Sequence, residues 1–154
     1  MKILIVYDTV SANKNTEKVA VAMNEVLKEK GFDVDCLYVK DVDPASVKNY
    51  DCVLVGSPTM AFRATRTIMQ FLDSFAKGEF SGKLASAFDT QIQSRFSGNA
   101  AKGIEKKLEM LGFKMVMPPL VAYVEGKMKE YYLKEGELEK TKKYAEDLAK
   151  KLQP

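Results

Sequence analysis

The sequence has no histidine and no tryptophan among its 154 residues. Without histidine, catalytic triads, general bases and metal sites that use imidazole are excluded. Any chemistry must therefore come from another side-chain type or from a cofactor. We expect no catalytic residue and no metal site in this chain.

Cysteine is also scarce, with only Cys36 and Cys52 present. Each lies within a predicted buried strand, and their spacing matches no zinc or redox motif. We interpret both as reduced thiols that pack as small apolar side chains, which is usual for buried cysteines.

Long apolar runs are absent. No run approaches the roughly 18 residues that a membrane-spanning helix needs, and the first one, at residues 2–7, is too short for a signal peptide and is followed directly by Asp8. We therefore expect a cytoplasmic protein with no membrane partner. The 24 basic and 21 acidic residues give a net charge of +3, so charge does not indicate a nucleic-acid partner either.

Apolar runs alternate with amphipathic segments along the whole chain. The length fits one domain covering residues 1–154. Since short loops join near-continuous apolar strands, we expect an α/β fold, with a five-stranded parallel sheet and helices on both faces. Strands are predicted at 2–7, 33–39, 51–55, 84–88 and 114–124, the last interrupted at Pro118 and Pro119; helices are predicted at 16–30, after Asp43, and at 66–76, 100–111 and 137–152.

Ligands of such sheets bind beyond the carboxyl ends of the strands, where the strand order reverses. This rule selects three segments, which we call the first site loop (residues 8–16), the second site loop (56–65) and the third site loop (89–99). The charged segment before the last predicted helix, with Tyr131 and Tyr132, is expected to be a loop that covers the sheet edge or forms an interface.

The first site loop can be an anion site or only a capped turn. It ends where a helix begins, so unpaired N–H groups and the helix dipole favour a dianionic phosphate there. The alternative is an N-cap at Asn15 or Thr16 followed by a solvated turn. The side chains available as donors are Thr9, Ser11, Asn13, Asn15 and Thr16.

The other two loops combine apolar and polar side chains. Met60 and Phe62 adjoin hydroxyls in the second site loop, and Phe96 follows a polar run in the third. A flat aromatic heterocycle with polar edges would find apolar faces and hydrogen-bond partners here. Taken individually, Met60 and Phe62 could equally be core residues.

A strand ends in a hydroxyl-rich loop that closes with Asn15-Thr16-Glu17, and the segments "VLVGSPTM" and "KLASAFDT…FSGNAAKGIEKKLEMLGF" follow it in order. In these motifs the chain resembles the short-chain flavodoxins over nearly its whole length. The loop is similar to the family's T-x-T-G-N-T-E phosphate loop, and the two segments are similar to its third strand and to its fourth strand with the following loop and helix. The resemblance implies a flavodoxin-like three-layer sandwich with strand order 2-1-3-4-5.

The resemblance also implies one non-covalent FMN. Its phosphate would contact the first site loop, at Thr9, Ser11, Asn15 and Thr16, with Asn13 also counted among the cofactor-binding residues. Its isoalloxazine ring would lie between the second and third site loops. The residues implied on its two sides are Ser57, Pro58, Thr59, Met60 and Phe62, and then Asp89, Thr90, Gln91 and Phe96.

Three departures from the family pattern affect these expectations. The first site loop is longer, has no glycine and adds Lys14, so we expect Asn13 to supply a left-handed conformation. The ring site lacks the family's usual Trp and Tyr stacking pair. Arg63, Arg66 and Arg95 replace the family's acidic surroundings, and a cation near the flavin would raise its reduction potential unless these arginines are solvated or paired with carboxylates.

Three functions follow from the resemblance. The first is an electron-transfer protein that meets redox partner proteins transiently, as a monomer or homodimer. The second is an FMN-dependent oxidoreductase of quinone or porphyrinogen type, in which the arginines hold substrate carboxylates. The third is a flavodoxin-fold module with weak or lost FMN binding.

Overall fold

The fold is an α/β sandwich built on one mixed sheet. A computed structural model describes residues 1–96, 98–128 and 130–153. The sheet has the order β2-β1-β3-β4-β6-β7, and β5 pairs with β4 outside this path. The strands are β1 (Lys2–Tyr7), β2 (Asp33–Tyr38), β3 (Cys52–Pro58), β4 (Leu84–Ile92), β5 (Lys114–Met115), β6 (Leu120–Lys127) and β7 (Glu130–Leu133).

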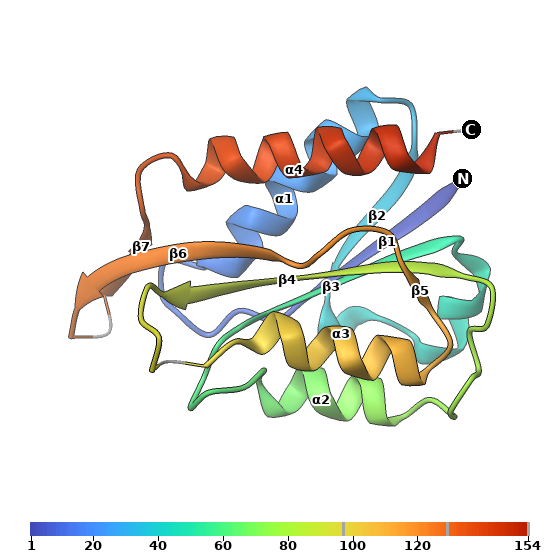
Figure 1. Ribbon diagram of the computed structural model, residues 1–154, viewed down its shortest axis with the longest axis horizontal. Helices are drawn as coiled ribbons and strands as arrows, with labels where there is room; N and C mark the ends of the chain where they lie inside the picture. Colours follow the sequence, from blue (N-terminus) through green and yellow to red (C-terminus); the bar gives the residue numbers. More distant parts are fainter. Residues whose placement is uncertain (97, 129, 154) are drawn as a thin grey trace.

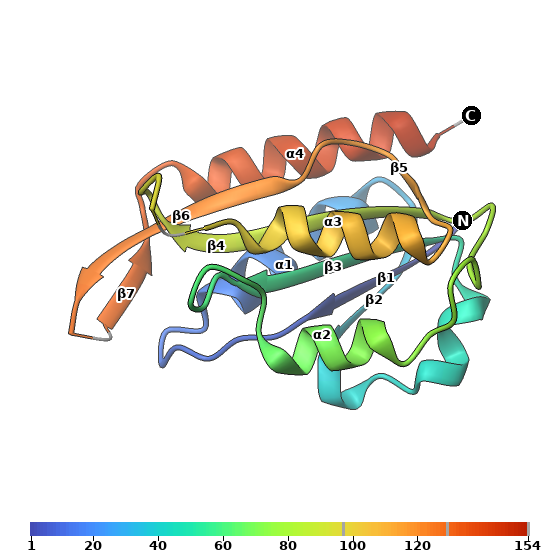
Figure 2. The same ribbon diagram turned by 60° about the horizontal axis from the view of Figure 1, so that its bottom comes forward.

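Two helices cover each face of the sheet (Figures 1 and 2). α1 (Asn15–Glu29) and α4 (Glu137–Leu152) pack on one face, and α2 (Arg66–Asp73) and α3 (Ala100–Met110) pack on the other. In the described part of the chain, no helix combines the length and apolarity needed to cross a membrane.

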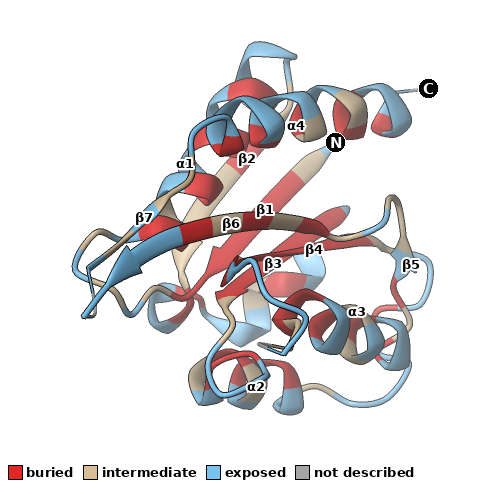
Figure 3. Ribbon diagram, turned by 60° about the vertical axis from the view of Figure 1, so that its left-hand side comes forward, coloured by how far each residue is buried: buried red, intermediate tan, exposed pale blue. Residues whose placement is uncertain are grey.

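Strand β1 shows how the sequence builds both cores. Alternate side chains of a strand point to opposite faces, so Ile3 and Ile5 join the core under α1 and α4, while Leu4 and Val6 join the core over α2 and α3. The central strands are therefore buried on both sides (Figure 3). This explains the near-continuous apolar run at the start of the sequence.

Helix α1 follows its predicted pattern. Val19, Met23 and Leu27 are completely buried in the core below it. The helix ends at Glu29, with Lys30 as its C-cap, and the chain turns at Gly31, which has φ of 92°. Gly31 N donates to Lys28 O at 3.0 Å and Phe32 N donates to Leu27 O at 3.2 Å, the two bonds of a Schellman cap.

The predicted fold class is confirmed, but the sheet has more strands than the five expected. The two prolines split the last predicted strand into β5 and β6, since proline cannot donate a ladder hydrogen bond. The segment expected to be a charged loop contains β7, which pairs antiparallel with β6 in the register Glu125–Tyr132 and Gly126–Tyr131. The result is a β6–β7 hairpin (residues 120–133) at the sheet edge.

Two 3-10 helices, η1 (Val39–Asp41) and η2 (Pro44–Asn49), link β2 to β3. The predicted cap of the second is confirmed, because the Asp43 carboxylate accepts from Ala45 N at 3.1 Å. Pro44 occupies the first helical position, where its missing N–H costs nothing.

Candidate functional site

A cavity of about 630 Å³ lies at the carboxyl ends of the parallel strands. This end of the sheet is on the left in Figure 1, opposite both chain termini. The volume is in the range of sites that enclose a small organic ligand. The lining comes from the three site loops and from the β6–β7 hairpin: Thr9, Val10, Ser11, Ala12, Asn15, Thr16, Pro58, Thr59, Met60, Ala61, Thr90, Gln91, Ile92, Val124 and Tyr131.

The three predicted loops thus converge on one cavity. The predicted residues that line it are Thr9, Ser11, Asn15, Thr16, Pro58, Thr59, Met60, Thr90 and Gln91. Asn13, Ser57, Phe62, Asp89 and Phe96 lie outside the lining, in positions described below. Ser97, which belongs to the third site loop, lies outside the described residues.

The first site loop ends in an unusual helix start. α1 begins at Asn15, and its N-cap is Lys14, with φ of 51° and ψ of 49° and no side-chain cap bond among the described residues. The alternative of an N-cap at Asn15 or Thr16 is therefore wrong. So is the expectation that Asn13 takes the left-handed conformation, since Lys14 takes it. The first N–H groups of α1 remain available for a ligand.

Two buried polar atoms of this loop lack partners. Within the part of the chain that the structure describes, Thr9 Oγ1 and Asn15 Oδ1 have no hydrogen-bond partner. A buried polar atom left unpaired is costly, so such atoms point to a ligand or water. Both residues line the cavity, which makes the cavity the place where their partners are expected.

The β6–β7 hairpin forms a wall that the sequence did not predict. The side-chain amides of Asn13 and Asn15 both donate to the backbone oxygen of Tyr131, at 2.8 and 2.9 Å. The hairpin therefore fixes the shape of the first site loop. Val124 and Tyr131 join the lining from this wall. The signal that could have found it is the β-prone run Tyr131-Tyr132-Leu133.

One hydroxyl pair joins the first and third site loops. Thr16 Oγ1 lies 2.7 Å from Thr90 Oγ1, and either can donate. Both side chains are buried, Thr16 at the start of α1 and Thr90 on β4. Each hydroxyl carries further acceptor capacity, so the pair can also serve a ligand in the cavity.

Ser57 stabilises the second site loop through two hydrogen bonds within the loop. Its Oγ accepts from Thr65 N at 2.9 Å and donates to Pro58 O at 2.8 Å. Thr65 caps α2 by accepting from Ile68 N, and its hydroxyl donates to Asp8 Oδ2 at 2.6 Å. Buried Asp8 therefore links the end of β1 to the start of α2.

The second site loop turns sharply at its tip. Met60 and Arg63 exchange backbone hydrogen bonds at 2.7 and 3.1 Å. The residues between them, Ala61 and Phe62, have φ of 47° and 76°. Non-glycine residues pay about 1 kcal/mol or more for this region, and here the strained turn directs the Phe62 side chain outward, 67% exposed.

The tips of the second and third site loops touch. Phe62 and Gly98 form an isolated parallel bridge. A Cβ on Gly98 would lie 2.5 Å from Phe62 Cα, and Gly98 has φ of 79°, so only glycine fits here. Phe96 is 75% exposed. Both phenylalanine side chains are therefore exposed on loops that also carry cavity-lining residues.

Asp89 lies beneath the cavity and is completely buried. Its Oδ2 accepts from Gln91 Nε2 at 2.8 Å, from Ala101 N at 3.1 Å and from Thr59 Oγ1 at 3.2 Å. Burial raises the pKa of Asp89, and these hydrogen bonds oppose that rise. Its visible role is to hold the second and third site loops against the start of α3.

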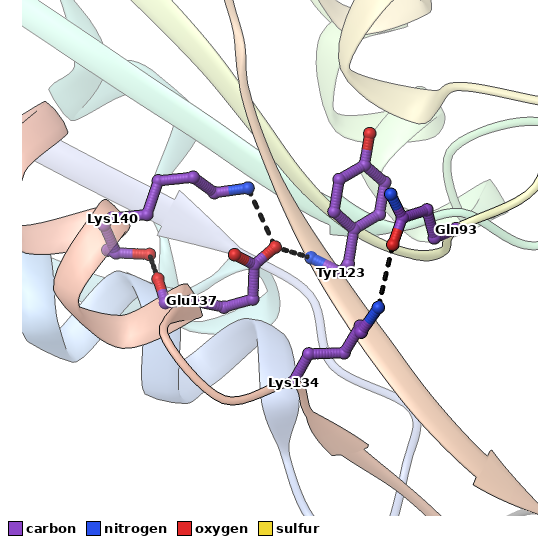
Figure 4. A network of polar contacts seen from close by, with 6 residues as sticks. Gln93, Tyr123, Lys134, Glu137 and Lys140 are labelled. Atoms are coloured by element: carbon purple, nitrogen blue, oxygen red, sulfur yellow. Dashed lines mark hydrogen bonds and ion pairs between the residues drawn. The ribbon is translucent and has the colours of Figure 1, made fainter.

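Two sets of polar contacts lie beside the hairpin (Figure 4). One joins the third site loop to Lys134, which follows β7, and the other joins β6 to the first turn of α4. Lys134 Nζ donates to Gln93 Oε1 at 2.8 Å. Glu137 Oε1 accepts from Tyr123 N at 2.7 Å and from Lys140 Nζ at 2.8 Å. The Lys134 bond connects the hairpin side of the cavity to the third site loop.

The exposed charges of the three site loops and the start of α2 are all positive. Lys14, Arg63, Arg66 and Arg95 are exposed, and no carboxylate among the described residues pairs with them. Arg95 lies 5.4 Å from the centre of the Phe96 ring, a cation–π contact. The acids of these loops, Asp8 and Asp89, are buried.

Comparison with known proteins identifies the family. The flavodoxin family profile matches residues 5–140, and the chain therefore belongs to the flavodoxin family. A probable flavodoxin 1 of Bacillus subtilis is 38% identical over 58 residues, which cover 38% of this chain and 35% of that protein.

Solved flavodoxin structures resemble this fold over nearly its full length. Oxidised flavodoxin 2 from Bacillus cereus has a TM-score of 0.83 at 23% identity and covers 99% of this chain and 100% of its own. A flavodoxin from the domain Archaea has a TM-score of 0.77 at 25% identity and covers 98% of both chains.

Proposed function

We propose that this protein binds one FMN non-covalently and carries electrons between protein partners. The observation that carries the proposal is the cavity, where the described residues leave the start of α1 without a side-chain cap and two buried oxygens without a partner, beside apolar walls. Membership of the flavodoxin family supports the same cofactor. FMN would supply reversible electron transfer, and the protein would supply its position and electrostatics.

The first site loop suits the phosphate end of FMN. The N–H groups at the start of α1 and the hydroxyls of Thr9, Ser11 and Thr16 are donors for a dianion. Lys14, exposed beside them, adds a positive charge. Asn15 Oδ1 is an acceptor, so it suits a ligand hydroxyl of the sugar chain rather than the phosphate itself.

The other walls suit a flat ring system. Met60, Ile92 and Val124 give the cavity apolar surface, while Thr90 and Gln91 supply polar edges. Tyr131 is the aromatic side chain of the lining. These walls would orient the ring and exclude water from its buried part, leaving an exposed edge for electron exchange.

The exposed cations of the site loops, which pair with no carboxylate among the described residues, would tune the potential. A positive charge near the flavin favours the reduced, anionic form by Coulomb attraction. We therefore expect a higher reduction potential than in a flavodoxin with acidic surroundings. A redox titration of the loaded protein against dyes of known potential measures this, and a potential unchanged on replacing Arg63 and Arg95 by glutamine would contradict it.

A visible spectrum of the purified protein, before and after addition of excess FMN and gel filtration, tests the cofactor. Retained flavin absorbance at one FMN per chain is the expected result. A preparation that stays colourless would instead favour the module with weak or lost FMN binding, in which Asn13 and Asn15 keep their bonds to the hairpin.

The second candidate is an FMN-dependent oxidoreductase acting on a quinone or a porphyrinogen. Unpaired Arg63, Arg66 and Arg95 favour it, because guanidinium groups bind carboxylates well. Steady turnover of NAD(P)H with a quinone by the loaded protein alone would support the enzyme. An electron carrier should show no such turnover without a reductase partner.

A further inference from the structure

Five exposed apolar side chains lie on the three site loops, next to the residues that line the cavity. They are Val10, Met60, Phe62, Ile92 and Phe96, with exposed fractions of 55, 46, 67, 46 and 75%, and we call them the rim patch. Three of them line the cavity itself, and the bridge between Phe62 and Gly98 brings the two loop tips together. Exposed large apolar side chains that share the loops around a cavity indicate an interaction surface.

The charges around the rim patch are of one sign. Lys14, Arg63 and Arg95 are exposed on the same loops as the rim patch, and Arg66 is exposed at the first position of α2. Asp8 and Asp89, the acids of the same loops, are 3% and 0% exposed and are occupied by hydrogen bonds. A partner approaching the described part of these loops therefore meets only positive charge.

The segments that flank these loops carry both signs. On one side, Lys40 is followed by Asp41, and on the other the hairpin carries Glu125, Lys127 and Glu130, all exposed. The net charge of the whole chain is only +3. The excess of exposed positive charge is thus a local feature of the three site loops. A partner protein therefore needs negative charge only where it faces these loops.

The geometry points to a docking site for an acidic electron-transfer protein, one whose exposed redox centre is ringed by carboxylates. This inference rests on the proposed function. Aromatic and arginine side chains are the residues that most often anchor interfaces. Opposite charge on the two surfaces steers the encounter and fixes orientation, with a strong dependence on salt. Electrons would pass singly from the partner's centre to FMN or back, so that one centre is oxidised as the other is reduced.

The test measures binding of two probe proteins to the FMN-treated protein by isothermal titration calorimetry. A plant-type [2Fe–2S] ferredoxin with an acidic surface is the first probe, and a cytochrome c with a basic surface is the second. The variant is Arg63→Glu with Arg95→Glu. The matched control is Lys30→Glu with Lys48→Glu, which makes the same charge change at exposed positions preceding β2 and β3, at the opposite end of the sheet.

We expect the ferredoxin to bind the unmodified protein at low salt and to bind at least about tenfold more weakly to the site variant. The control should bind as the unmodified protein does, and Arg63→Gln with Arg95→Gln should fall between. Adding salt to about 0.2 M should weaken binding, because screening shortens the reach of the charges.

Any of three results would overturn the inference: the ferredoxin does not bind, it binds the site variant as tightly as the unmodified protein, or cytochrome c binds as tightly as the ferredoxin. The flavin absorbance of the same samples keeps the two proposals apart. A flavin-loaded protein that fails to bind the acidic probe contradicts only the docking site. A protein that retains no flavin but binds the acidic probe as described contradicts only the proposal that the chain binds FMN.

Discussion

Replacing Thr16 by valine should weaken FMN binding sharply. Thr16 is 1% exposed, lines the cavity at the first turn of α1, and shares its hydroxyl with Thr90 at 2.7 Å. Valine keeps the side-chain shape and removes only the hydroxyl. If this hydroxyl donates to a phosphate, its loss removes one hydrogen bond to a charged group.

Such a bond contributes about 1.5–3 kcal/mol, which corresponds to a loss of affinity of about 10- to 150-fold. The assay is a titration of the apoprotein with FMN, followed by quenching of flavin fluorescence. Thr16→Ser keeps the hydroxyl and should bind within a few-fold of the unmodified protein. Urea unfolding of each variant shows whether the loss of the bond to Thr90 has changed stability instead.

Thr90→Val separates the two roles of the Thr16 hydroxyl, which are the hydrogen bond to Thr90 and the proposed hydrogen bond to the phosphate. It breaks the same 2.7 Å bond but leaves Thr16 free to serve the phosphate, so its effect on affinity should be smaller than that of Thr16→Val. If Thr16→Val binds FMN within twofold of the affinity of the unmodified protein, the Thr16 hydroxyl does not contact the phosphate.

The remaining predictions concern stability and reactivity. Gly98→Ala should lower the free energy of unfolding by about 1–3 kcal/mol in urea titrations, because the new Cβ meets the Phe62 backbone at φ of 79°; an unchanged value would mean that the loop tips do not touch. The raised pKa of Asp89 means that the folded state keeps this proton to higher pH than the unfolded chain, so stability falls as pH rises from about 4 through the folded-state pKa. Relative to Asp89→Asn, which does not titrate, the unmodified protein should lose stability as pH rises above about 4; a pH-independent difference would contradict this. Burial raises the pKa of Cys36 to about 11 and of Cys52 to about 12, so a disulfide reagent at about pH 8 should label Cys36 slowly and Cys52 only after unfolding, whereas rapid labelling of both would contradict the burial.

The sequence predicts most of the fold because its patterns are local. The buried stripe of α1, the cap at Asp43 and the apolar run of β1 each depend on a few adjacent residues, and all are present in the structure. β7 was missed because its charged flanks resemble a loop and its strand exists only through pairing with β6.

The site was predicted less completely because several of its contacts join residues that are far apart in the sequence. The strand-end rule brings together the three site loops, and most of the predicted residues line one cavity. Tyr131 was not predicted: the run Tyr131-Tyr132-Leu133 is β-prone, but the contact with the first site loop exists only once the hairpin has formed. The left-handed residue is Lys14 rather than Asn13, and Asn13 instead donates its side-chain amide to the Tyr131 backbone oxygen. Complete burial of Asp89 likewise depends on tertiary packing.

The central claim is that a phosphate-bearing flavin occupies this cavity with its phosphate in the first site loop. The most direct test compares the affinities of the apoprotein for FMN and for riboflavin, which lacks the phosphate. We expect one FMN per chain, bound at least about 100-fold more tightly than riboflavin, since several charge-assisted hydrogen bonds depend on the phosphate. Equal affinities, or no binding of either flavin, would contradict this claim.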